Sequence, residues 1–369
     1  MIFVNPDARS NRNIPNIGLA YAATHFRTRV VDLNTMPEPA DRYLNEGTDV
    51  LGLSVQSRSY GEAEKITRAY LEKYPAAKVR SISGFLDVQC CYPYLDMGEK
   101  LEFREPFSDA YPFPDYELFD SFALFGRNWR AGEWSYAIMT SQGCPYQCTY
   151  CSSRNRKWLS RGPRNCFEEL EQAVKKWGIK SFVILDDCFN VDKQRCLEFC
   201  SLVKPLGLSW NCSNGLRADR FDAELAAGLK DAGCSQISFG IESVIPEILA
   251  GIKKGETIEQ IENAVDTASR YYPPGGINGF FIVGLPGSSY ERDMESLNWA
   301  IKKKIHAHFN YYVPFDRRME HDALFYGETA HPLSSEYPQE LQRKVYEAAA
   351  KFCRGAQPGF FKRLLRKLS

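Results

Sequence analysis

Short apolar stretches alternate with amphipathic stretches over the first 84 residues. Apolar runs at 2–5, 29–33, 49–55 and 78–83 are predicted to be buried strands, and the spacing at 17–26 and 61–74 predicts helices. In the second of these helices Ala63, Ile66, Ala69 and Tyr70 share one face, with charged residues opposite. Strands and helices alternating at these lengths predict a parallel, doubly wound sheet.

The pattern is lost between residues 85 and 133, which are rich in proline, aromatic and acidic residues. It resumes with predicted strands at 135–140, 181–186, 207–212, 235–241, 277–284 and 307–312. Predicted helices lie between them, at 167–177, 193–203, 222–232, 257–271 and 289–303. This series is shorter than the ~250 residues of a closed eight-fold barrel, and six strands predict a partial (βα)6 barrel.

We therefore expect an α/β protein: a shortened Rossmann-like domain at 1–105, a linker at 106–133, a partial barrel at 134–315 and a short helical region at 316–369. The stretch 360–368 is basic and amphipathic, which favours a helix end that packs on the barrel over one that binds an anionic membrane.

Composition narrows the functional classes. The 369 residues carry 46 basic and 46 acidic side chains, so a nucleic-acid partner is not expected. No apolar run reaches the ~18 residues of a membrane span, and the first residues lack the pattern of a secretory signal. We expect a cytoplasmic protein whose 12 cysteines are reduced, as in an anaerobic or strongly reducing cell.

Three of these cysteines form the strongest chemical signal. Cys144, Cys148 and Cys151 lie in a loop that directly follows a predicted strand. Thiolates are the usual ligands of iron–sulfur clusters, and three of them leave one iron of a 4Fe–4S cluster open. The alternative is a zinc site or a non-catalytic cluster, but a closed zinc site usually pairs two cysteine clips, and no second clip lies nearby in the sequence.

The C-x3-C-x2-C spacing, with aromatic Tyr150 before the last cysteine, resembles the radical S-adenosylmethionine (SAM) superfamily. The resemblance implies a 4Fe–4S cluster whose open iron holds the methionine part of SAM. It also implies reductive cleavage of SAM to a 5′-deoxyadenosyl radical, with electrons from a low-potential donor such as flavodoxin or ferredoxin.

The resemblance further implies SAM contacts at the ends of successive strands, where barrel enzymes keep their sites. Asp186 and Asp187 are expected near the methionine amine, and Arg217 near its carboxylate. The other expected SAM residues are Tyr150, Asn211, Ser238, Glu242, Ser243, Gly284 and Pro286. Each alone is equally explained as a strand-end cap or a tight turn. His308, Tyr311 and Tyr312 are candidates for lining a substrate pocket.

The N-terminal pattern resembles the superfamily branch that carries a cobalamin-binding domain. Expected cobalamin contacts are Pro15, Asp32, Ser54 and Gly84, although the Asp-x-His-x-x-Gly motif that supplies a histidine ligand in many cobalamin proteins is absent. In that branch one SAM methylates cobalamin and a second generates the radical that activates an unactivated carbon for methylation.

The predicted function is therefore cobalamin-dependent radical methylation. The alternatives are a cobalamin-independent radical SAM enzyme that performs a dehydration, an oxidation or a rearrangement, and a non-catalytic iron–sulfur or zinc protein. A protein or peptide side chain, such as one on methyl-coenzyme M reductase, is one candidate substrate. A lipid, a porphyrin and a small-molecule intermediate are others.

Overall fold

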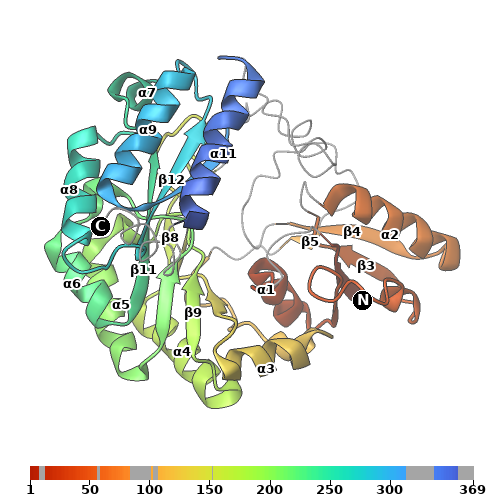
Figure 1. Ribbon diagram of the computed structural model, residues 1–369. Helices are drawn as coiled ribbons and strands as arrows, with labels where there is room; N and C mark the ends of the chain where they lie inside the picture. The colour runs from red at the N-terminus through yellow and green to blue at the C-terminus, as the bar shows by residue number, and fades with distance from the viewer. Residues whose placement is uncertain are drawn as a thin grey trace. The chain divides into compact units, whose positions relative to one another are not determined.

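The computed structural model describes residues 1–7, 13–55, 59–83, 101–102, 107–151, 153–312 and 336–355. The chain forms two compact units (Figure 1): residues 1–142 with 159–183, and residues 143–158 with 184–369. Gly84 and the basic stretch at 360–368 lie outside the described residues. No helix among the described residues is long and apolar enough to cross a membrane.

The first unit contains a five-stranded sheet made of β1 (Ile2–Asn5), β2 (Val30–Asp32), β3 (Val50–Leu53), β4 (Lys78–Ser83) and β5 (Leu101–Glu102). Its order is β2-β1-β3-β4-β5, and all neighbours are parallel. The helices are α1 (Ile17–Phe26) and α2 (Tyr60–Lys73), as predicted. Since β2 and β3 flank β1, the strand order reverses between β1 and β3, and ligands of such sheets bind outside the carboxyl ends of the strands at this point.

Part of the predicted linker is well structured. It contains a 3-10 helix, η3 (Tyr116–Leu118), and α3 (Phe122–Ala131), a helix that the sequence analysis did not predict. Tyr116 is fully buried, with its ring 5.3 Å from that of Trp129 and 5.4 Å from that of Tyr136. The aromatic residues of this segment therefore fill a core.

A six-stranded sheet follows the order β13-β12-β11-β10-β9-β6. Its strands are β6 (Tyr136–Ile138), β9 (Ser181–Ile184), β10 (Ser209–Cys212), β11 (Cys234–Glu242), β12 (Ile277–Val283) and β13 (His306–Tyr311). Strands β10 to β13 pair in parallel. All six strands lie where the sequence predicted them, so the α/β class with a six-stranded set is confirmed.

The helices between these strands also match their predicted positions: α4 (Pro163–Trp177), α5 (Lys193–Val203), α6 (Ala223–Asp231), α8 (Ile258–Ala268) and α9 (Tyr290–Lys303). The six-residue helix α7 (Pro246–Gly251) was not predicted, nor were the 3-10 turns η1 (Arg42–Leu44), η4 (Phe189–Val191), η5 (Lys204–Leu206) and η6 (Ala218–Arg220). In the predicted helical C-terminal region the structure has α11 (Gln339–Gly355).

Candidate cofactor site

The three cysteines lie in a loop bracketed by two short antiparallel strands, β7 (Ser141–Gln142) and β8 (Leu159–Ser160). Backbone hydrogen bonds coil the loop on itself. The N–H of Cys151 donates to the carbonyl of Cys148 at 3.1 Å, and that of Arg156 donates to the carbonyl of Cys144 at 3.0 Å. The three thiols therefore lie on one short coiled segment, as the ligands of an iron–sulfur cluster often do.

The loop begins at a glycine that no other residue can replace without strain. Gly143 has a φ of +83°, and a Cβ there would lie 2.2 Å from the backbone carbonyl of Lys157. Its N–H donates to Oδ2 of Asp187 at 2.7 Å. The tight approach of the two ends of the loop thus depends on a missing side chain.

Asp187, which follows β9, organises this loop. While Oδ2 accepts from Gly143, Oδ1 accepts from the hydroxyl of Ser153 at 2.6 Å. Its neighbour Asp186 is buried, and its charge adds to the burial that raises the pKa of Cys196 and Cys212. Of the two carboxylates that were predicted together, Asp187 therefore contacts the cysteine loop and Asp186 lies near buried cysteines.

The tyrosine of the cysteine motif is tied to the end of β11. The Tyr150 hydroxyl donates to Oε1 of Glu242 at 2.8 Å, and Nζ of Lys254 lies 3.4 Å from the same oxygen. Lys254 is also 3.3 Å from Glu256, and all three charged side chains are buried. Burial alone would lower the pKa of Lys254, but Glu256 and Glu242 raise it, so the amine stays charged.

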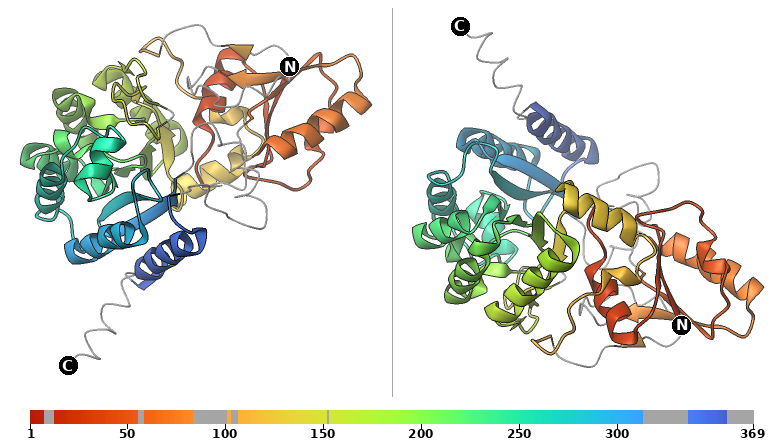
Figure 2. Two further views of the ribbon diagram at one scale, coloured as in Figure 1. Left: turned by 90° about the horizontal axis from the view of Figure 1, so that it is seen from above. Right: turned by 90° about the horizontal axis from the view of Figure 1, so that it is seen from below.

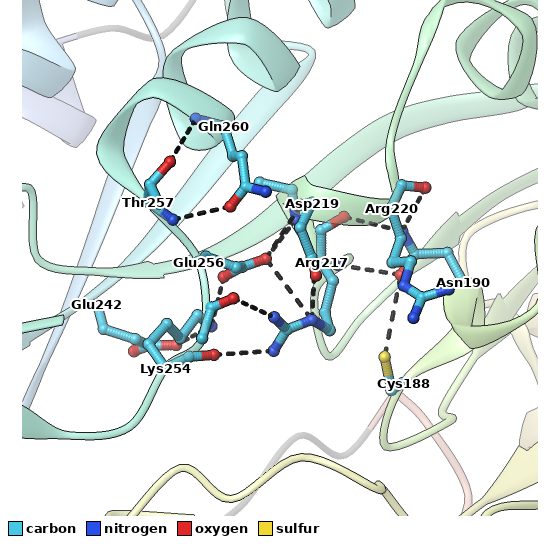
Figure 3. Close-up of polar contacts among 12 residues, drawn as sticks. Cys188, Asn190, Arg217, Asp219, Arg220, Glu242, Lys254, Glu256, Thr257 and Gln260 are labelled. Carbon is cyan, nitrogen blue, oxygen red and sulfur yellow. Dashed lines mark hydrogen bonds and ion pairs between the residues drawn. The ribbon is translucent and has the colours of Figure 1, made fainter. Parts of the chain in front are cut away.

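Arg217 completes this buried network (Figure 3). Its Nε donates to Asp219 at 2.8 Å, and Nη1 donates to the carbonyl of Lys254 at 3.2 Å. The guanidinium carbon lies 3.5 Å from the centre of the Tyr146 ring, within the cysteine loop. Arg217, expected from the sequence to bind the methionine carboxylate, is thus engaged by the protein itself.

The thiols differ in their surroundings. A hydrogen bond with the Cys188 thiol lowers the pKa of Cys144 to about 7. Burial raises the pKa of Cys148 and raises that of Cys151 to about 11, while the charges of Lys254 and Arg217 oppose the rise at Cys148. The two buried cations thus favour the thiolate form of Cys148, the form that metal ligation requires.

Several other predicted residues share one face of β10–β13. Asn211 pairs with Gln236 and Ser238 with Asn278, and paired residues point to the same side of a sheet. Asn278 donates to the Ser238 hydroxyl at 3.1 Å, and its Oδ1 lies 3.2 Å from Nε2 of His308. These side chains form a continuous polar strip.

The remaining candidates lie apart from this strip. Tyr311 is three residues from His308 along β13 and so points to the opposite face, where its ring stacks on Tyr346 at 5.0 Å. Tyr312 directly follows β13 and donates its backbone N–H to Val283. The structure does not bring Tyr311 and His308 into one pocket. Buried Ser243 accepts from the N–H of Ile245 at 3.2 Å, as a turn cap does.

The glycine-rich turn 284–287 ends β12. Gly284 and Gly287 both have positive φ, at +75° and +81°, and Pro286 between them is exposed. The N–H of Gly284 donates to Asp293 at 2.8 Å. The turn therefore exposes Pro286, while a buried carboxylate holds the amide of Gly284.

Three of the predicted cobalamin residues, Pro15, Asp32 and Ser54, lie among the described residues of the first unit. Asn16, which caps α1, donates to the Ser54 hydroxyl at 2.9 Å and to Asn5 at 3.3 Å. Asp32 is fully buried and accepts from Asn5 at 2.8 Å and from Ser121 at 3.1 Å. Pro15 is also buried, which leaves half-buried Ser54 as the accessible member of the predicted set.

Sequence reasoning missed several members of the site. Lys254 and Glu256 were missed because charged residues between two helices are normally solvated. Asn190 was missed as well; it exchanges hydrogen bonds with the backbone of Arg217, at 2.9 and 3.0 Å. The sequence signal for this network is the pair of opposite charges in the stretch KKGE, residues 253–256, which follows the end of α7.

A parallel α/β sheet that carries a three-cysteine loop beside its strand ends is the arrangement expected of an iron–sulfur protein. Residues 138–300 match the family model described as the radical SAM superfamily. This part of the chain is therefore a radical SAM domain, and such a domain implies a 4Fe–4S cluster and SAM.

Curated relatives have methyltransferase names. An uncharacterized methyltransferase of Pyrococcus horikoshii is 33% identical over 217 residues, which cover 56% of this chain and 45% of that protein. The cytidylyl-2-hydroxyethylphosphonate methyltransferase of Streptomyces wedmorensis is 27% identical over 223 residues, covering 56% of this chain and 40% of that one. The matches span less than half the length of these two relatives.

Two solved structures share the fold over most of the chain. The radical SAM methyltransferase TsrM of Kitasatospora setae, solved with tryptophan and a SAM analogue, has a TM-score of 0.67 and 16% identity, covering 89% of this chain and 77% of its own. The cobalamin-dependent radical SAM enzyme OxsB has a TM-score of 0.65 and 16% identity, covering 95% and 61%.

Proposed function

We propose that the protein is a cobalamin-dependent radical SAM methyltransferase that methylates an unactivated carbon. The observation that carries the proposal is the cysteine loop fixed beside the ends of β9 and β11 by Asp187 and Glu242. When bound, the cluster and SAM supply a 5′-deoxyadenosyl radical, and cobalamin supplies the methyl group.

The residues of the second unit fit a cluster and SAM. Cys144, Cys148 and Cys151 are the proposed ligands, since three thiolates leave one iron for SAM. The buried hydroxyl of Tyr146 has no hydrogen-bond partner in the described structure, and this leaves a polar atom for a bound group to satisfy. Among the described residues no three His, Cys, Asp or Glu side chains converge tightly enough for a single metal ion.

We assign SAM contacts to residues that face this loop. Ser238 and Asn211 lie on the polar strip, and the turn 284–287 lies at the same end of the sheet, with Gly284 and Pro286 at the adenine. Because Arg217 already has protein partners, we assign it to positioning: its guanidinium holds the Tyr146 ring, and so the start of the loop.

Cobalamin is assigned to the first unit, outside the carboxyl ends of β1 and β3, where the strand order reverses. The half-buried Ser54 hydroxyl is proposed as the contact there, and the hydrogen bonds among Asn5, Asn16 and Ser54 hold it in place. Asp32 is proposed to support this edge from beneath, because both of its oxygens already accept hydrogen bonds from the protein.

The substrate is proposed to meet the polar strip, where Asn278 and His308 offer hydrogen bonds suited to an amide or another polar group. A protein or peptide side chain satisfies this chemistry, and methyl-coenzyme M reductase remains a candidate. An electron donor such as flavodoxin or ferredoxin is proposed as the partner that reduces the cluster.

The test is the iron and cobalamin content of protein purified and reconstituted without oxygen, with SAM cleavage measured after reduction. About four irons, one cobalamin and formation of 5′-deoxyadenosine are the expected result. Four irons and SAM cleavage without cobalamin, even with cobalamin in excess, would overturn the methyl-transfer proposal and favour a cobalamin-independent reaction. Bound iron or zinc without any SAM cleavage would instead identify a non-catalytic metal protein.

A further inference from the structure

The glycine-rich turn after β12 is held by one buried carboxylate. Asp293, in the first turn of α9, accepts from the N–H of Gly284 at 2.8 Å and from the hydroxyl of Ser288 at 2.6 Å. Its side chain also accepts a short hydrogen bond from the hydroxyl of Tyr337. Asp293 is only 2% exposed, so these donors take the place of water.

The third donor comes from a different part of the chain. Tyr337 and Glu336 belong to the segment that leads into α11, and Glu336 accepts from the N–H of Gly287 at 2.9 Å. This segment therefore reaches both positive-φ glycines of the turn, Gly287 directly and Gly284 through Asp293. Two separate contacts to one four-residue turn make an incidental meeting of side chains a poor explanation.

The segment is itself anchored on the sheet. The Gln342 side chain donates to the carbonyl of Tyr337 at 2.7 Å, Tyr346 stacks on Tyr311, and the Cys353 thiol donates to the carbonyl of Ala307 at 3.0 Å. Figure 2 shows α11 alongside the last strands and α9. The contacts of α11 with the sheet, and its hydrogen bond to Tyr337, thus hold this tyrosine in place.

We infer that Tyr337 and Asp293 are positioning residues for SAM, and that the segment 336–355 completes the SAM site from outside the sheet. The inference rests on the proposed function, in which the turn 284–287 lies against the adenine. Because a turn with two positive-φ glycines has many unfolded alternatives, its bound shape depends on these outside contacts. Loss of the Tyr337 hydroxyl should therefore weaken SAM binding without slowing the chemical step.

The variant Tyr337→Phe tests this, with Tyr271→Phe as the matched control at a half-buried tyrosine outside the turn and the segment. SAM binding is measured by equilibrium dialysis on anaerobically reconstituted protein, and 5′-deoxyadenosine formation is measured across SAM concentrations. We expect Kd and KM for SAM to rise about tenfold in Tyr337→Phe, the value of one lost hydrogen bond to a charged group. The kcat for cleavage should stay within about twofold, and the control should match the parent protein in both.

A second measurement uses the unaltered protein and does not depend on how a variant folds. If the segment and SAM stabilise the same turn, SAM must in return stabilise the segment, because coupling between sites is reciprocal. Amide hydrogen exchange over residues 336–342 should slow by about the same factor when SAM is added to the reconstituted protein.

An unchanged Kd in Tyr337→Phe with normal iron content, or exchange over 336–342 that ignores SAM, would overturn the inference. These outcomes are separate from failure of the proposed function. Protein that binds SAM but transfers no methyl group still reports on Tyr337, whereas protein that binds no SAM refutes the proposed function itself.

Discussion

A buried ion pair between Arg161 and Glu169 stabilises the base of the cysteine loop. Arg161 follows β8, and its backbone N–H donates to Thr140 at 3.0 Å, just before β7. Its Nη1 lies 2.5 Å from Oε2 of Glu169, and both side chains are at most 1% exposed. Burial would lower the pKa of Arg161, but Glu169 raises it, so the guanidinium remains charged.

The variant Glu169→Gln removes the negative charge and keeps the shape. The amide oxygen of glutamine can still accept the bond that the hydroxyl of Tyr136 now donates at 2.9 Å, so the lost charge dominates the change. Removing one partner of a buried pair costs about 3–5 kcal/mol, because the other charge is left unpaired away from water. We expect the free energy of unfolding to fall by that amount.

The matched control is an ion pair of nearly equal length on the surface. Lys204 and Asp231 lie 2.6 Å apart, with side chains 55% and 66% exposed. Water and salt screen such a pair, and Asp231→Asn should therefore cost only about 0.2–1 kcal/mol. The assay is urea unfolding followed by circular dichroism, with the parent and both variants compared at one pH and ionic strength.

Adding Arg161→Met to Glu169→Gln sharpens the test. Because the unpaired charge is then gone, the double variant should lose less than the sum of the two single variants, by at least about 1.5 kcal/mol. A cost for Glu169→Gln as small as that of the surface control would refute the reasoning, since burial would then not set the strength of the pair.

Three further predictions follow. Gly143→Ala should reduce bound iron more than tenfold, because its Cβ would clash with a backbone carbonyl. The control is Gly61→Ala, where no atom lies near the added Cβ, and it should keep the normal iron content. Equal iron content in the two variants would contradict the prediction. Alanine at any of the three loop cysteines should abolish SAM cleavage. Cys188→Ala should retain SAM cleavage, although the Cys188 thiol contacts Cys144. If Cys188→Ala loses as much iron as the loop variants, the proposed set of cluster ligands is wrong. Asp222→Ala removes the cap of α6 and should cost about 1 kcal/mol at pH 7. Burial would raise the pKa of Asp222, but its hydrogen bond from Leu225 and a lysine partner lower it below 3.8; the stabilisation is therefore present above that pH and is lost as the pH falls through the folded pKa. Unfolding at pH 7 and pH 3 checks this, and an equal cost at both would contradict it.

The fold was largely predictable because parallel strands buried on both faces read as apolar runs. All strands from β9 to β13 lie within three residues of their predicted limits. The unpredicted α3 shows where this reasoning fails. Proline, acidic and aromatic residues are dense around it, as in a linker, yet Phe125 and Trp129 are fully buried. Aromatic density does not distinguish a linker from a small aromatic core.

The sheet topology made it possible to predict which strand ends lie beside the cysteine loop. Successive strands of a parallel sheet end at the same edge, which brings Asp187 and Glu242 to the loop. Side-chain direction was not predictable. Tyr311 points away from His308, because the two lie three residues apart on β13 and odd-spaced positions on a strand face opposite sides.

The charged network around Glu242 combines two features that lower stability. Glu242 has a φ of +67°, a conformation that non-glycine residues rarely adopt, and it shares Lys254 with Glu256 in a buried network. Both features are unfavourable for stability, since backbone strain and buried charge each cost free energy. They meet at the residue that accepts a hydrogen bond from Tyr150, within the cysteine motif. Backbone strain and buried charge are expected where a structure supports chemistry. An apolar contact at this position would destabilise the fold less, but it would not fix the loop in one orientation as a hydrogen-bonded network does.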